Sequence, residues 1–131
     1  MRKMIMLALA LAGLAAETAV GAPEAVVDQV LLRPFEDIAG KEGMMLVVTY
    51  PPGSQDVAHR HDAHGFVYVL EGTVVMQVRG GPQVTLTAGQ TFYEGPDDVH
   101  IVGYNASRTV PAKFVVFLVK NKGVPFFVPV P

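Results

Sequence analysis

Histidine is the residue type whose spacing most clearly indicates chemistry in this 131-residue chain. His59, His61 and His64 lie close together, and His100 follows far downstream. Residues two apart in a β-strand point to the same face, so His59 and His61 can present both imidazoles to one cavity. His100 is the histidine available to join them from a distant, facing strand. Three nitrogens converging at about 2.0–2.2 Å would form a site for a divalent metal.

His64 is a candidate fourth ligand. In an extended strand its parity is opposite to that of His59 and His61, so we prefer a three-histidine site, although a turn at Asp62–Ala63 would remove that objection. Ligation by imidazole suits Fe, Zn, Ni or Cu better than Mg or Ca, which prefer oxygen. We therefore predict one divalent transition metal held by His59, His61 and His100.

The acidic residues near the histidines are expected to be mostly solvated turn residues, because aspartate is favoured in turns by its local hydrogen bonds. Asp62 could also orient a ligand histidine. The chain has no Gly-x-Ser-x-Gly motif, phosphate-binding loop or dinucleotide fingerprint, and it has no cysteine for thiolate or iron–sulfur chemistry. No catalytic residue and no organic cofactor site is therefore assigned. The acidic residues considered are Asp56, Asp62, Glu94, Asp97 and Asp98.

Short strands must position these histidines, since segments of alternating or β-branched character recur between Gly- and Pro-containing turns. Glu71-Gly72 and Arg79-Gly80-Gly81-Pro82 lie where hairpin turns are needed. Short strands at this spacing predict an all-β sandwich or closed barrel. The expected strands are Met44 to Tyr50, Phe66 to Leu70, Thr73 to Val78, Gln83 to Leu86, Thr91 to Tyr93, His100 to Tyr104 and Lys113 to Val119.

Two flanking segments are harder to assign. Residues 25–37 could form a short helix or an edge strand, broken at Arg33-Pro34. The tail from Val124 is rich in proline, which removes backbone donors, so it cannot form a full ladder. We expect the tail to pack as an extended arm on the barrel or against a second subunit.

The N-terminus resembles a secretory signal peptide. Arg2 and Lys3 precede the apolar run from Met4 to Ala16, and Val20-Gly21-Ala22 offers small residues for cleavage. Thirteen apolar residues fall short of the ~20 that span a bilayer as a helix. We therefore predict a signal peptide over residues 1–22, export to the periplasm or medium, and one domain over residues 23–131.

Charge argues against two classes of partner. The formal net charge is −2, with no basic stripe for nucleic acid and no polybasic face for anionic lipid. The expected partners are a small molecule and, from the exposed hydrophobic content, a second copy of the chain in a homodimer.

Two motifs resemble those of the cupin superfamily, whose members are small double-stranded β-helix or jelly-roll barrels. The first cupin motif places His-x-His between two glycines, and here Gly53, His59, His61 and Gly72 fall in register. The second motif is matched, with small shifts, by four residues of which His100 is the ligand: Gly89, Pro96, His100 and Asn105. The resemblance covers about Met44 to Val119 and implies three histidine ligands on a barrel interior.

One position departs from the first motif. The glutamate that normally gives the fourth ligand falls at Gly65, which has no side chain to offer. A site without that carboxylate would keep the full charge of the ion, making it a stronger Lewis acid, and would make Mn less favoured than in other cupins. The resemblance implies a dioxygenase-like metalloenzyme acting on an unidentified small molecule. The alternatives are a non-catalytic metal-dependent binding or sensing protein, and a metal-free barrel.

Overall fold

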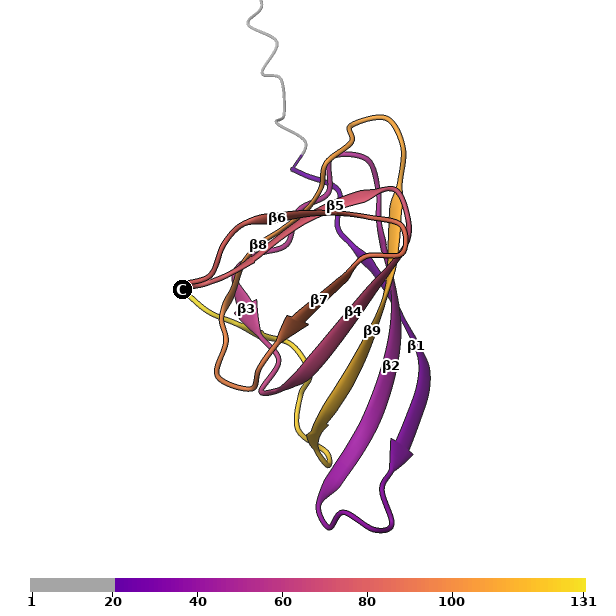
Figure 1. Ribbon diagram of the computed structural model, residues 1–131, viewed down its shortest axis with the longest axis vertical. Coiled ribbons are helices and arrows are strands. Elements are labelled where there is room, and N and C mark those ends of the chain that lie inside the picture. Colours follow the sequence, from indigo (N-terminus) through magenta and orange to yellow (C-terminus); the bar gives the residue numbers. More distant parts are fainter. Residues whose placement is uncertain (1–20) are drawn as a thin grey trace, which may run out of the picture.

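The computed structural model describes residues 21–131, which form two antiparallel β-sheets that face each other (Figure 1). One sheet has the order β1-β2-β9-β4-β7, and the other has the order β10-β3-β8-β5-β6. No helix is present among these residues, and none therefore is long and apolar enough to cross a membrane. The strands are β1 (Val26–Pro34), β2 (Lys41–Tyr50), β3 (His59–Arg60), β4 (Ala63–Glu71), β5 (Thr73–Val78), β6 (Val84–Thr87), β7 (Thr91–Glu94), β8 (His100–Asn105), β9 (Ala112–Asn121) and β10 (Val128–Pro129).

The predicted all-β barrel is confirmed, and each of the seven expected strands is present with ends shifted by a few residues. The segment 25–37 forms the edge strand β1, which pairs with β2 in antiparallel register. The proline-rich tail lies against the barrel, where β10 pairs with β3 over two residues. Residues 1–20 of the predicted signal peptide lie outside the described part of the chain.

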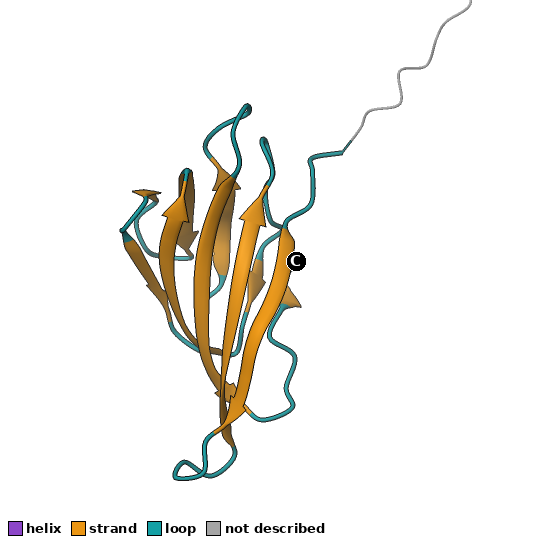
Figure 2. Cartoon of the chain, turned by 90° about the vertical axis from the view of Figure 1, so that its right-hand side faces the viewer, coloured by secondary structure: helices purple, strands orange, loops and turns teal. Residues whose placement is uncertain are grey.

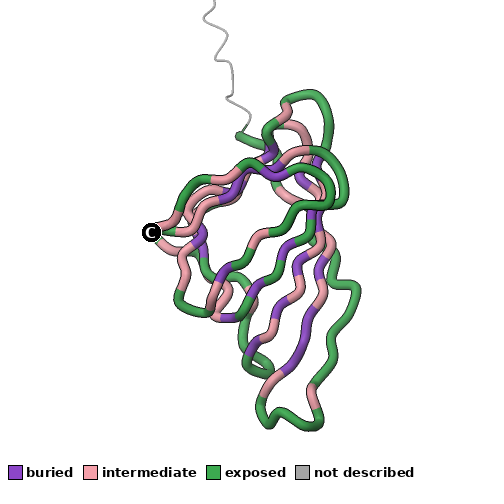
Figure 3. Tube along the Cα trace, in the orientation of Figure 1, coloured by how far each residue is buried: buried purple, intermediate pink, exposed green. Residues whose placement is uncertain are grey.

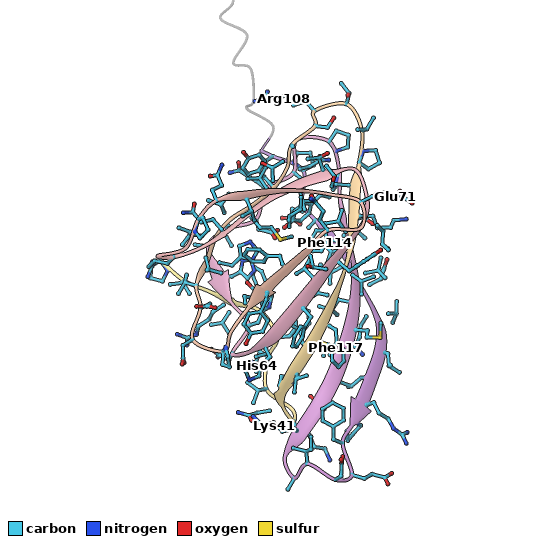
Figure 4. The ribbon with its side chains drawn as sticks, in the orientation of Figure 1. Lys41, His64, Glu71, Arg108, Phe114 and Phe117 are labelled. Atoms are coloured by element: carbon cyan, nitrogen blue, oxygen red, sulfur yellow. The ribbon has the colours of Figure 1, made fainter. Side chains whose placement is uncertain are left out.

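Two central strands, β4 and β9, bury alternate side chains, as expected for strands with one face on a core. In β9 the buried positions are every second residue from Ala112 to Lys120, and in β4 they run from Ala63 to Val69. These strands pair with each other, and β9 also pairs with β2 along its whole length (Figure 2). Phe114 of β9 points into the space between the sheets (Figure 4). The interior is therefore lined by apolar side chains from several strands.

Strand β1 differs from the others because all nine of its residues are exposed (Figure 3). It nevertheless carries large apolar side chains, among them Val30, Leu31 and Leu32, which are 56%, 49% and 44% exposed. A strand with one paired edge and apolar side chains on an open surface is a common site of association between chains.

The turn between β4 and β5 requires glycine at residue 72 for two reasons, its left-handed backbone and the lack of space for a Cβ atom. Gly72 has φ +73°, and a Cβ there would lie 2.6 Å from the carbonyl oxygen of Pro111 and 2.8 Å from Cα of Ala112. Gly123 has a similar φ of +77°, but a Cβ there would meet nothing within 4 Å. The two glycines therefore separate the cost of the left-handed backbone from the cost of a clash.

We expect Gly123→Ala to lower the free energy of unfolding by about 1–2 kcal/mol, the cost of placing alanine in the left-handed region. Gly72→Ala should lower it by roughly 2–5 kcal/mol, because backbone atoms must also move. Urea unfolding of both variants beside the wild type measures the difference. Equal losses would show that the contact with Pro111 is relieved without cost.

Candidate metal centre

The register of two short strand pairings brings the histidines together. His59 of β3 is paired directly with His100 of β8, so their side chains lie side by side on the inner face. The ring centroids of these two histidines are 4.9 Å apart, and those of His59 and His61 are 4.8 Å apart. One ring nitrogen from each of His59, His61 and His100 lies within 4.8 Å of the others. The three histidines singled out in the sequence therefore share one site.

Backbone carbonyls orient two of the imidazoles. Nδ1 of His59 donates to the carbonyl oxygen of Val57 at 2.8 Å, and Nδ1 of His61 donates to that of Phe126. A carbonyl oxygen only accepts, so each Nδ1 carries a proton and each Nε2 is the nitrogen available to a metal. Burial lowers the pKa of His59, which favours the neutral form that can bind a metal.

Glu94 is one of two acidic residues, with Asp56, that the sequence analysis places in solvated turns and the structure places at the site. Instead of lying in a solvated turn, it is the last residue of β7 and is only 3% exposed. Its Oε1 lies 2.9 Å from Nε2 of His61, and its Oε2 lies 3.1 Å from Nδ1 of His100. Burial raises the pKa of Glu94, but the contacts with His100 and His61 outweigh it and lower the pKa to about 2. The site therefore contains an ionised carboxylate.

Strand parity was the signal that could have identified Glu94. The expected strand ended at Tyr93, whereas β7 extends one residue further. Because Phe92 is half-buried and faces inward, a residue two positions later on the same strand must also face inward. The same contacts with Glu94 raise the pKa of His61, although burial acts in the opposite direction.

The donor set fits a divalent transition metal. Oε2 of Glu94 and both ring nitrogens of His100 are buried without a hydrogen-bond partner in the described part of the chain. Buried polar atoms are rarely left unpaired, and lone pairs that converge on one point suit a cation. Ligands about 2.1 Å from one ion are at most about 4.2 Å apart, so nitrogens within 4.8 Å need only a small contraction.

The C-terminal arm completes one wall of the site. Phe127 stacks on His59 with ring centroids 4.3 Å apart, next to the Phe126 carbonyl that holds His61. Pairing of β10 with β3 and a bond from the amide of Val130 to the carbonyl of Ala58 fix the arm in place. The tail is therefore part of the site, which its sequence did not indicate.

The histidines and Glu94 line a cavity of about 60 Å³ inside the barrel. A cavity of this volume can hold several water molecules or a small ligand. Tyr50 and Asp56 also line it, and the Tyr50 hydroxyl donates to the Asp56 carboxylate. Burial and the neighbouring Asp56 raise the pKa of Tyr50, so its hydroxyl stays protonated. The apolar lining includes Leu46, Val48, Val67, Met76, Phe114 and Val116.

The remaining polar candidates lie away from the three histidines. His64 is exposed on the outer face of β4 (Figure 4), and its Nδ1 lies 2.7 Å from the Tyr93 hydroxyl. A left-handed turn does occur at Asp62, with φ 49°, yet His64 remains outside the group. Asp62 pairs with Arg60 at 2.8 Å, and Asp98 accepts a bond from the amide of Gly95 within a turn.

The ion-pair contacts of Glu94 predict a pH optimum for the stability of the chelator-treated protein. The lowered pKa of Glu94 stabilises the fold above about pH 4.5, and that contribution is lost as pH falls towards about 2. The raised pKa of His61 stabilises it below about pH 6.5, and that contribution is lost as pH rises through the folded value. The combined contribution should therefore be largest between about pH 4.5 and 6.5.

Glu94→Gln should reduce the free energy of unfolding by about 2 kcal/mol within this window and by less on either side. Urea unfolding of chelator-treated protein between pH 3 and pH 9, with the exposed Glu71→Gln as control, measures the difference. A loss of the same size at every pH would exclude the ionic contribution.

Comparison with known proteins agrees with the fold and the motifs. The Cupin domain family model matches residues 46–118, more than half of the chain. No curated protein sequence matches the chain significantly. Because the solved structures described below share less than 25% identity with this chain, their likeness concerns the fold alone.

Three solved structures illustrate this likeness. An uncharacterized conserved protein with a double-stranded β-helix domain from Klebsiella pneumoniae is 19% identical, with a TM-score of 0.63 over 82% of this chain and 86% of that one. A cupin domain protein from Bordetella pertussis is 20% identical, with a TM-score of 0.58 over 77% of this chain and 98% of that one. An oxalate oxidase is 24% identical, with a TM-score of 0.64 over 82% of this chain, which spans only 55% of the oxidase. By its two sheets, its matched motifs and the family model, this chain belongs to the cupin superfamily.

Proposed function

We propose that this chain is an exported metal-binding cupin and a mononuclear metalloenzyme that acts on a small molecule. The observation that carries the proposal is the convergence of His59, His61 and His100 at a buried cavity. In His59 and His61 a backbone carbonyl holds Nδ1, which leaves Nε2 as the nitrogen that faces the other residues of the site, as in a metal-ligating histidine. Export rests on the N-terminal sequence pattern alone.

A divalent transition metal held by these histidines would supply Lewis-acid activation and, if it is iron or copper, oxygen-dependent chemistry. The protein contributes orientation and a mostly apolar cavity. Asp56 and Tyr50 add a carboxylate and a hydroxyl that can hold a proton beside the substrate. This pair favours an enzyme over a protein that only binds its ligand.

The cavity supports a small substrate with one group that can coordinate the metal. Its polar groups gather near the histidines, while the rest of the lining is aliphatic or aromatic. Among the structurally similar proteins, oxalate oxidase is by name an enzyme for a small dicarboxylate. That likeness supports a small substrate and does not identify it. The alternative is a non-catalytic protein that binds or senses a small molecule through the same metal.

Metal content tests the proposal directly. We expect the full chain, produced without an affinity tag, to hold nearly one transition-metal ion per molecule by elemental analysis. His59→Ala/His61→Ala should abolish binding and His100→Ala should greatly reduce it, because each removes a ligand from a site of few donors. The exposed His64→Ala serves as the matched control and should keep the metal.

The identity of the metal then chooses between the two candidate functions. Iron or copper would support oxygen-dependent catalysis, whereas zinc would favour Lewis-acid chemistry or binding. Wild-type protein that stays free of metal after reconstitution with iron, nickel, copper and zinc would refute the three-histidine site.

We also propose that the protein is a homodimer in which β1 contributes to the contact. Its exposed valine and leucine side chains support this, because apolar groups gathered on one edge are stabilised by burial against a second copy.

Leu32→Asp should weaken the dimer at least tenfold, since a buried unpaired charge costs more than about 1.4 kcal/mol. Sedimentation equilibrium measures this, with Gln29→Glu on the same strand as control. A wild-type chain that is monomeric at all concentrations would exclude the dimer.

A further inference from the structure

We propose that Glu94 is a ligand of the metal and takes, from β7, the place of the carboxylate that the first cupin motif puts on β4 at Gly65. The inference rests on the proposed metal site and extends it from three ligands to four. Three observations support it: the pairing of Gly65 with Glu94, the space beside Gly65, and the contacts of the Glu94 carboxylate with the histidines.

Strand register places the two residues at the same point of the barrel wall. Gly65 of β4 is paired directly with Glu94 of β7. Both residues are buried, and in β4 the buried positions alternate with exposed ones, so both face the interior. A side chain from either residue would therefore enter the same region next to the histidines.

The Glu94 side chain fills most of the space next to Gly65. A Cβ on Gly65 would lie 3.0 Å from Cγ of Glu94 and 3.3 Å from its Oε1. No positive φ is recorded at Gly65, so its backbone does not require glycine. The glycine is explained by the volume that the Glu94 side chain occupies. The carboxylate that the motif loses at Gly65 on β4 is then supplied by the buried Glu94 on β7.

The contacts place Glu94 on the metal side of the histidines. A carboxylate that merely orients a ligand histidine bonds to the outer ring nitrogen, which in His61 is Nδ1 and is already held by the Phe126 carbonyl. Oε1 of Glu94 instead meets Nε2 of His61, at 2.9 Å. Two ligands about 2.1 Å from an ion and at right angles lie about 3.0 Å apart. The distance therefore matches that between neighbouring ligands of one ion.

The second carboxylate oxygen is buried beside a ring nitrogen that, within residues 21–131, also lacks a partner. Oε2 of Glu94 lies 3.1 Å from Nδ1 of His100, yet neither atom has a hydrogen-bond partner among the described residues. A shared cation would satisfy both atoms. With a carboxylate in the ligand set, the expectation of a purely imidazole site no longer holds. Manganese, which accepts carboxylate oxygen readily, is then no longer disfavoured.

Cobalt(II) binding to the full chain tests the proposal without an activity assay. The dissociation constant is measured by competition with a chromophoric chelator, and the visible absorption of bound cobalt reports a change in its ligands. We expect Glu94→Ala and the isosteric Glu94→Gln to weaken binding by about 10–100-fold and to change the spectrum. Asp97→Asn, an exposed neighbour outside the site, should leave both unchanged.

An exchange of the two residues provides the sharper test. Glu94→Gly/Gly65→Glu returns a carboxylate to the same region from β4, so it should regain most of the affinity and the spectrum that Glu94→Gly loses. A folded exchange variant that binds as weakly as Glu94→Gly would overturn the equivalence of the two positions. Unchanged cobalt spectra in Glu94→Ala and Glu94→Gln would overturn ligation by Glu94, while the proposed three-histidine site would stand. A wild-type chain that binds no cobalt would overturn both proposals.

Discussion

The candidate site depends on the pairing of His59 with His100 across β3 and β8. Strand β3 has only two residues, too few to hold its position by its own ladder bonds. It is held between β8 on one edge and the C-terminal β10 on the other. The last residues of the chain therefore fix the backbone that carries His59 and, through the Phe126 carbonyl, the ring of His61.

Much of this arrangement could be predicted because strands leave a periodic pattern in the sequence. The His-x-His spacing, the seven core strands and the convergence with His100 follow from side-chain alternation and from the two motifs. The sequence predicts that the proline-rich tail does not form a regular ladder, because proline removes backbone donors. It does not predict which part of the barrel the tail contacts. Its role beside the histidines depends on tertiary contacts such as the Phe127 ring on His59, which have no local sequence signal.

Charge explains why a buried carboxylate is tolerated next to these histidines. An isolated ionised carboxylate in an apolar cavity is costly, and here Glu94 is buried with the rings of His61 and His100 as its close polar neighbours. Without metal, the raised pKa of His61 favours its protonated form, in which both ring N–H groups face acceptors and the positive charge lies next to Glu94. A bound cation would replace that proton, so the Glu94 carboxylate would face a positive charge in both the metal-free and the metal-bound site.

The departure at Gly65 shows what a motif on a single strand can and cannot specify. A motif records which position along one strand carries a side chain, whereas the cavity requires only that a carboxylate fill a certain volume. In an antiparallel sheet, that volume is equally close to the residue paired across the ladder, here Glu94 opposite Gly65. A missing ligand in a β-barrel motif should therefore be sought on the neighbouring strand before the site is considered incomplete, and a glycine at the vacant position indicates where to look.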